Sequence, residues 1–159
     1  MHRVPTLIAA VMFAMAAMAS PAAADNAAAV RTFYDFLSNP GSKKHADKVR
    51  ANLTADWQSI GDYSGKAKGA EGFIAQLGGF SKRIPDLTWK VEEMLEVGDR
   101  VIVRGRATGT PNGPLFGVDG KGKAFEIMSI DIHTMKDGKV AKTYHVEDWS
   151  GALRQLKGK

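Results

Sequence analysis

The chain has 159 residues, no cysteine and a formal net charge of +5. The length predicts one domain, and the lack of cysteine excludes disulfides, thiolate metal sites and a thiol nucleophile. The basic residues are scattered and form no dense stripe interleaved with aromatic side chains, so we expect no nucleic-acid partner.

The first 24 residues carry the pattern of an export signal. Arg3 precedes an apolar run over residues 7–18, and Ala22-Ala23-Ala24 supplies the small residues that a signal peptidase requires. The run is shorter than the ~20 apolar residues of a membrane-spanning helix, although an uncleaved anchor is the alternative. We therefore expect a signal peptide at residues 1–24, cleavage after Ala24, and a periplasmic or secreted protein with no stable membrane anchor.

Apolar residues recur at helical spacing in the first half of the remaining chain. Val30, Phe33 and Leu37, for example, share one face of a helix. Ser42 is a suitable N-cap for the helix that follows. Helices are predicted over residues 26–37, 42–53 and 69–80, with a short strand or loop at residues 57–60.

The pattern changes to period two after Pro85, which is typical of strands. Turns are expected at Gly98-Asp99 and Asp137-Gly138, and a last helical turn or two near the C-terminus. Strands are predicted over residues 87–95, 101–108, 123–135 and 139–147. Helices followed by antiparallel strands indicate an α+β domain, residues 25–159, in which the helices pack on one face of a curved sheet.

The Asp137-Gly138 turn fixes how the last two strands pair, if it is a two-residue loop. In antiparallel register its flanking residues pair first, and the others follow. The expected pairs are Lys136 with Lys139, His133 with Lys142, Asp131 with Tyr144, Ser129 with Val146, and Ile127 with Asp148. The opposite face would carry Met128, Ile130 and Ile132 with Thr143, His145 and Glu147.

The first of these two faces has the composition of a small-ligand pocket. Polar Asp131, His133 and Tyr144 would lie among apolar Ile127 and Val146. An aspartate in apolar surroundings resists ionisation, which moves its pKa toward the range useful for acid–base catalysis. The alternative is that this face meets solvent and the methionine–isoleucine face is the core.

Asp148 follows the last strand directly, where a short helix begins. If Asp148 faces the pocket, it is the candidate acid–base group. If Asp148 only caps the helix, the sequence says much less about function. Arg104 would assist an anionic intermediate only if its face of the sheet turns inward.

Several short motifs, in their order and spacing, resemble the SnoaL-like polyketide cyclases, also called ester cyclases. They are Pro85-Asp86-Leu87, Gly98-Asp99-Arg100-Val101, Gly113-Pro114-Leu115-Phe116-Gly117 and Asp137-Gly138-Lys139-Val140, followed by Tyr144, Asp148 and Gln155-Leu156. The resemblance covers roughly residues 26–157. It implies an NTF2-like fold, a cone of curved antiparallel sheet closed by N-terminal helices around a pocket, commonly as a homodimer.

The resemblance also implies a chemistry. In cyclases of the family, an aspartate at the position of Asp148 acts as general acid and base in an aldol ring closure, without a metal or an organic cofactor. Tyr144 stands where the family usually has an aromatic residue. Pro111, however, replaces a histidine that is common in the family, and an export signal is unusual for antibiotic assembly.

We therefore expect an exported enzyme, a cyclase-like lyase or isomerase, that performs aldol-type acid–base chemistry on a small carbonyl compound in an enclosed pocket. The alternative is a periplasmic protein of the same fold that binds a small ligand without catalysis. A closed apolar cavity with a buried Asp148 would favour catalysis. A wide cavity with Asp148 at its solvent rim would favour binding.

Overall fold

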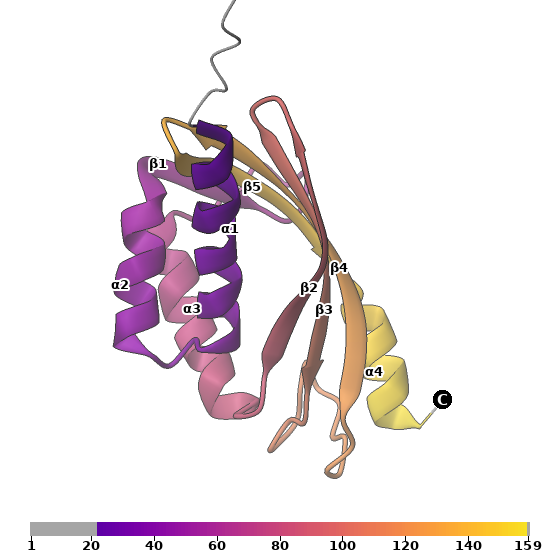
Figure 1. Ribbon diagram of the computed structural model, residues 1–159. Helices are drawn as coiled ribbons and strands as arrows, with labels where there is room; N and C mark the ends of the chain where they lie inside the picture. The colour runs from indigo at the N-terminus through magenta and orange to yellow at the C-terminus, as the bar shows by residue number, and fades with distance from the viewer. Residues whose placement is uncertain (1–21, 159) are drawn as a thin grey trace, which may run out of the picture.

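The computed structural model describes residues 22–158, so the predicted signal peptide lies almost entirely outside the described residues. This part of the chain folds into helices and strands in the order shown in Figure 1. The elements are α1 (Ala22–Ser38), α2 (Lys43–Asn52), β1 (Leu53–Ile60), α3 (Ala70–Arg83), β2 (Thr88–Val97), β3 (Arg100–Gly109), β4 (Phe125–Lys136), β5 (Lys139–Glu147) and α4 (Trp149–Lys157).

The helices follow the sequence closely. Ser42 is the N-cap of α2, and its side chain accepts a hydrogen bond from the backbone N–H of His45. α1, α2 and α3 lie together on one side of the curved sheet, whereas α4 packs against β4 at the other end of the molecule (Figure 1). Within residues 22–158 no helix is both long enough and apolar enough to cross a membrane.

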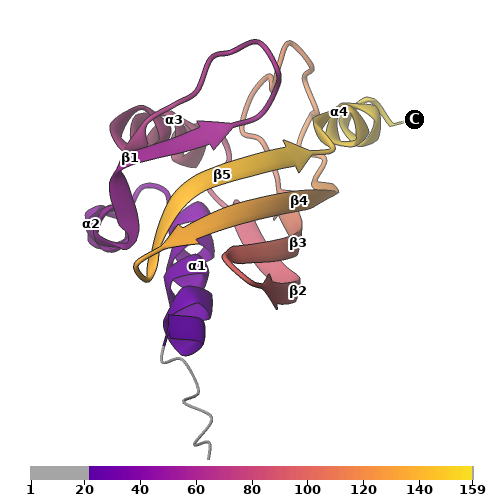
Figure 2. The ribbon, with the colours of Figure 1, turned by 90° about the horizontal axis from the view of Figure 1, so that it is seen from above.

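The sheet has five strands in the order β1-β5-β4-β3-β2 (Figure 2). The four predicted antiparallel strands are confirmed as β2 to β5. The segment expected to be a short strand or loop is instead the full strand β1, which pairs with β5 in parallel. The sheet is therefore mixed and open, and the α+β cone-like fold is as expected.

The predicted register of the last hairpin is wrong beyond a β-bulge in β5. Lys136 pairs with Lys139 as expected, but Ala141 is an extra residue, and the pairing shifts by one beyond it. His133 is opposite Thr143, Asp131 opposite His145, and Ser129 opposite Glu147. Since side chains alternate along a strand, this shift turns Tyr144 and Val146 to the face opposite Asp131.

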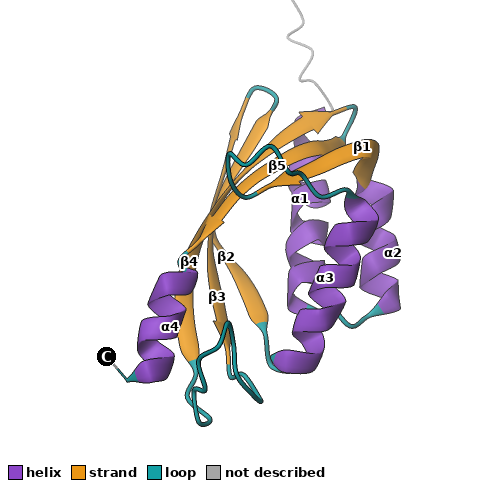
Figure 3. Ribbon diagram, turned by 180° about the vertical axis from the view of Figure 1, so that it is seen from behind, coloured by secondary structure: helices purple, strands orange, loops and turns teal. Residues whose placement is uncertain are grey.

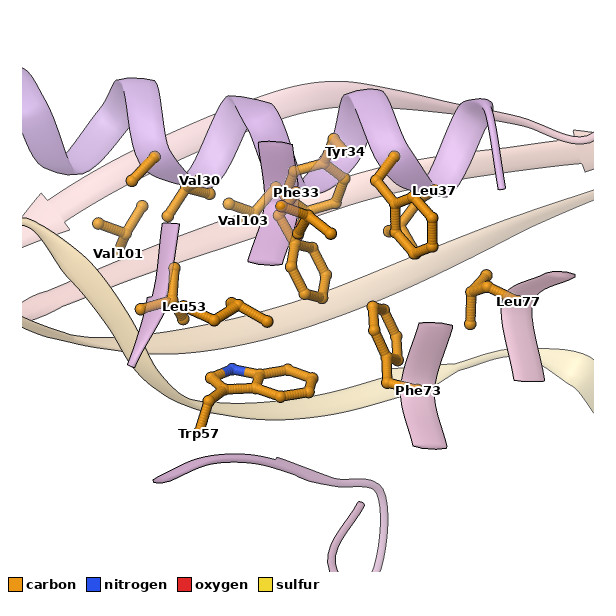
Figure 4. Close-up of a cluster of buried hydrophobic side chains, with 14 of the residues drawn as sticks. Val30, Phe33, Tyr34, Leu37, Leu53, Trp57, Phe73, Leu77, Val101 and Val103 are labelled. Atoms are coloured by element: carbon orange, nitrogen blue, oxygen red, sulfur yellow. The ribbon is translucent and has the colours of Figure 1, made fainter. Parts of the chain in front are cut away.

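The apolar core consists of two clusters. The larger one fills the space between the sheet and α1 to α3, where the rings of Phe33 and Phe73 stack with centroids 5.2 Å apart and Trp57 packs beside them (Figure 4). The smaller one lies where β4 begins, and includes Phe125 and, from α4, Leu156. Each cluster buries large side chains that the sequence marks as apolar, which supplies the main driving force for folding.

Candidate functional site

A cavity of about 120 Å³ lies on the helix-covered side of the sheet, with walls from both core clusters. Its walls are mostly apolar or aromatic, and most of the polar groups come from β1, β4 and β5, with Lys68 and Gln76 added from the segment before α3 and from α3 itself. α4 and the loop that joins β3 to β4 lie at the same end of the sheet (Figure 3). The lining residues include Phe33, Phe73, Leu77, Phe80, Trp89, Phe116 and Trp149, together with Ser59, Lys68, Asp131, Thr143, His145 and Glu147.

Asp131 is the buried carboxyl group of this cavity. Only 3% of the residue is exposed, and burial raises the pKa of its carboxyl group to about 6. Its Oδ2 accepts hydrogen bonds from Tyr34 Oη at 2.7 Å and from Ser129 Oγ at 3.3 Å. None of the hydrogen bonds among the described residues uses Oδ1, which is therefore available to a molecule in the cavity.

A chain of buried hydrogen bonds leads to Asp131. Trp57 Nε1 donates to Thr143 Oγ1 at 3.2 Å, and Thr143 Oγ1 lies 3.0 Å from His133 Nδ1. His133 Nε2 lies 3.3 Å from Tyr34 Oη, which donates to the Asp131 carboxylate. With Asp131 ionised, the assignment that keeps every contact a hydrogen bond makes His133 an Nε2–H tautomer, and all the donors point toward Asp131.

The titration of the two groups next to Asp131 fits this assignment. Burial lowers the pKa of His133 to about 3, so its ring is neutral at ordinary pH. Burial and the neighbouring Asp131 charge raise the pKa of Tyr34, which keeps its hydroxyl protonated and able to donate. The chain therefore supports an ionised Asp131 by hydrogen bonds, and the nearby charge of His145 adds to this support.

His145 and Glu147 form a second polar group on the cavity wall. His145 Nδ1 lies 2.8 Å from Glu147 Oε1, and Nε2 lies 3.0 Å from Ser59 Oγ. The hydrogen bond with Glu147 raises the pKa of His145. The sequence placed both residues on the methionine–isoleucine face, because the bulge at Ala141 has no recognisable sequence signal.

Asp148 lies at the N-terminus of α4 and is not among the residues that line the cavity. Its Oδ1 accepts a hydrogen bond from Gly151 N–H at 2.7 Å, and about half of its side chain is exposed. A Cβ on Gly151 would collide with this carboxylate, so glycine gives the cap its room. The placement matches the capping alternative and gives no support to a catalytic role, which remains a prediction.

The structure divides the other predicted pocket residues between the two faces of the sheet. His133 and Ile127 are buried on the inner face with Asp131. Tyr144 and Val146 were wrongly placed there: they lie on the outer face, 38% and 67% exposed, because of the shift in register. Arg104 also lies outside, where it pairs with Glu93.

The curved sheet and the helices that cover one side of it define an α+β cone-like domain of the NTF2-like class. A protein of Catenulispora acidiphila with a ketosteroid isomerase-like fold, solved with trimethylamine, matches with a TM-score of 0.63. The two share 14% identity over 81% of this chain and 92% of that one. At this identity the likeness shows the fold alone.

The chain belongs to the SnoaL-like polyketide cyclase family, whose model matches residues 27–156. A protein of Jannaschia sp. CCS1, provisionally assigned as a SnoaL-like polyketide cyclase, is 26% identical over 88% of this chain and 96% of that one, with a TM-score of 0.74. A protein of Bacillus cereus, provisionally assigned as a polyketide cyclase, is 27% identical over 84% and 80%, with a TM-score of 0.68. Among curated proteins, none matches this sequence.

Proposed function

We propose that this protein catalyses proton transfer next to the carbonyl group of a small compound, leading to an aldol-type ring closure without a cofactor. Asp131 is the group that removes and returns the proton. The observation that carries the proposal is a buried carboxyl group in an apolar cavity, with one oxygen held by Tyr34 and the other free. The family assignment supports the same class of chemistry.

The geometry suits a carboxyl group that acts in both directions. As a carboxylate, Asp131 takes a proton from the carbon next to the substrate carbonyl, and the resulting enolate attacks a second carbonyl in the same molecule. The alkoxide that forms then takes the proton back from Asp131, so the group is regenerated. A pKa near 6 suits both halves of this cycle, because the best catalytic pKa lies close to the working pH.

The replacement Asp131→Asn tests this role. Asparagine still offers Tyr34 an acceptor but cannot carry the proton, so the fold is retained and catalysis is lost. Small β-dicarbonyl compounds in D₂O report the first step as hydrogen–deuterium exchange, followed by NMR. We expect the exchange rate to fall at least about 100-fold. Asp119→Asn, in the exposed β3–β4 loop, is the matched control and should exchange at the wild-type rate.

Two outcomes would contradict the proposal. Exchange at the wild-type rate in Asp131→Asn would remove Asp131 from the mechanism. Compounds that bind the wild-type protein in the cavity but show no exchange would favour the non-catalytic binding protein. The exposed position of Asp148 is the observation on the side of binding, since the carboxyl group expected to be buried is not.

The outer face of the sheet supports the expected homodimer. Its centre is an exposed apolar surface made of Met128, Ile130, Ile132, Tyr144 and Val146. Exposed apolar surfaces of this kind mark contact sites. Arginine–glutamate pairs such as Arg106–Glu126 lie beside it and offer both signs of charge, which suits a second copy of the same face across a twofold axis.

Light scattering after size exclusion tests the dimer. Ile130→Lys places a charge in the centre of the apolar surface and should give monomers with an unchanged circular dichroism spectrum. Ser64→Lys, on an exposed segment away from the sheet, should stay dimeric. A wild-type protein that is monomeric at high concentration would refute the dimer.

Export belongs to the same proposal and rests on the first 24 residues. Expression of the full chain, followed by cell fractionation and mass spectrometry, tests it. A mature protein that begins at Asp25 in the periplasm or medium is expected. An intact N-terminus in the cytoplasm would refute export.

A further inference from the structure

Ser59 lies near the end of β1, where its backbone is held on both sides. Along one edge β1 pairs with β5, so that Ser59 is beside Thr143. Along the other edge Ser59 N–H donates to Lys68 C=O at 2.9 Å, and Lys68 N–H donates to Ser59 C=O at 3.0 Å. The side chain lines the cavity although only 4% of the residue is exposed. Its hydroxyl therefore has a fixed position on the cavity wall.

His145 connects this hydroxyl to a carboxylate. Because Glu147 Oε1 can only accept when ionised, the contact of 2.8 Å assigns a proton to His145 Nδ1. In the neutral ring, Nε2 then accepts the hydrogen bond from Ser59 Oγ at 3.0 Å. Serine, histidine and carboxylate thus stand in the order and at the distances of an activated nucleophile, its base and the group that orients the base.

Two neighbours complete the arrangement. A Cβ at Gly61 would lie 3.0 Å from Cε1 of the His145 ring, so the glycine gives the ring room beside the strand. Lys68, whose backbone holds Ser59, also lines the cavity. The positive charge of Lys68 acts on His145 and offsets part of the rise in its pKa that Glu147 causes.

We propose that Ser59, His145 and Glu147 form a second catalytic site in this cavity, which hydrolyses esters of small, largely apolar carboxylic acids. Ser59 Oγ bonds to the ester carbonyl carbon while its proton moves to His145 Nε2. The carbon–oxygen bond to the alcohol breaks, and the alcohol leaves with that proton. Water then attacks the acyl-serine with His145 as base, which releases the acid and restores Ser59. Asp131 takes no part in these bond-making and bond-breaking steps.

The test uses the folded, full-length mature protein and a small alkyl fluorophosphonate, which labels activated serines. Mass spectrometry of the digested protein should find the adduct on the peptide that contains Ser59, and p-nitrophenyl acetate should be hydrolysed. Ser59→Ala and His145→Gln should each lower hydrolysis at least about 100-fold, whereas the matched control Ser81→Ala, a serine on α3 that bonds to Gly78, should not.

Circular dichroism establishes that each variant is folded. A wild-type protein whose Ser59 stays unlabelled overturns the proposal, as does hydrolysis that His145→Gln leaves unchanged in a folded protein. Since the proton-exchange experiment on Asp131 uses another substrate and another residue, either site can fail while the other stands.

Discussion

The role of Asp148 is the sharpest prediction, because the sequence left two roles open and the structure places the residue as a helix cap. The structure predicts that Asp148→Ala destabilises the protein and that Asp148→Asn does not. Alanine removes the acceptor for Gly151 N–H, whereas asparagine is as good an N-cap as aspartate. If Asp148 were instead the proton carrier, asparagine would abolish the chemistry and leave stability unchanged.

The size of the effect follows from two contacts. Loss of an N-cap side chain costs about 1 kcal/mol. The ion pair with Arg154, 3.7 Å long and half-exposed on both sides, adds no more than about 0.3 kcal/mol after screening by solvent. For a domain of this length about 1 kcal/mol corresponds to a fall of about 4 °C in Tm.

Urea unfolding followed by circular dichroism gives the free energy of unfolding for the three proteins. Hydrogen exchange at α4 adds a local readout, because loss of the cap frays the first turn and loosens the buried Ala152 and Leu156. Equal destabilisation by alanine and asparagine would refute the capping role. Normal stability of Asp148→Asn together with loss of α-proton exchange would restore Asp148 as the catalytic acid.

Three further outcomes follow from the buried groups. Tyr34→Phe removes a donor to Asp131 Oδ2, so the pKa of Asp131 should rise by about one unit above its value near 6, which ¹³C NMR of the carboxyl group measures. An unchanged titration would show that Tyr34 does not stabilise the carboxylate. The pKa of His133 is about 3 in the folded protein and 6.5 in the unfolded chain. Its contribution to stability is therefore present above pH 6.5 and is lost as the pH falls toward 3. Relative to His133→Gln, the free energy of unfolding of the wild-type protein should fall over that range. Gly105→Ala places a Cβ 2.6 Å from Ser129 Oγ and should lower Tm by several degrees, and an unchanged Tm would show that this serine can move at no cost.

The helices and most strands could be predicted because their apolar residues repeat with a clear period. Val101 and Val103, for example, are both fully buried and alternate with residues that are exposed or partly buried. β1 was underpredicted because it gains its hydrogen bonds from β5, which lies far along the chain. Pairing between distant strands leaves no local pattern to read.

The candidate site could be predicted only in part, for one physical reason. Asp131 and His133 were placed on the correct face, since they precede the hairpin on the unbulged strand. Beyond Ala141 the prediction assigned each residue of β5 to the wrong face of the sheet, so Tyr144 was predicted to line the pocket in place of His145. A single extra residue in one strand carries no composition signal, and only the tertiary fold decides where it is accommodated.

The position of the cavity between the two apolar clusters has a practical consequence. A compound that fills it would touch Phe33 and Leu77 on one side and Phe80 and Trp149 on the other, and would connect the two apolar clusters. At a free ligand concentration of 100 times Kd, binding would add about 2.7 kcal/mol to the stability of the folded state. The melting temperature of the protein can thus rank candidate ligands before any reaction has been observed, and can identify the natural ligand by the stability that it adds.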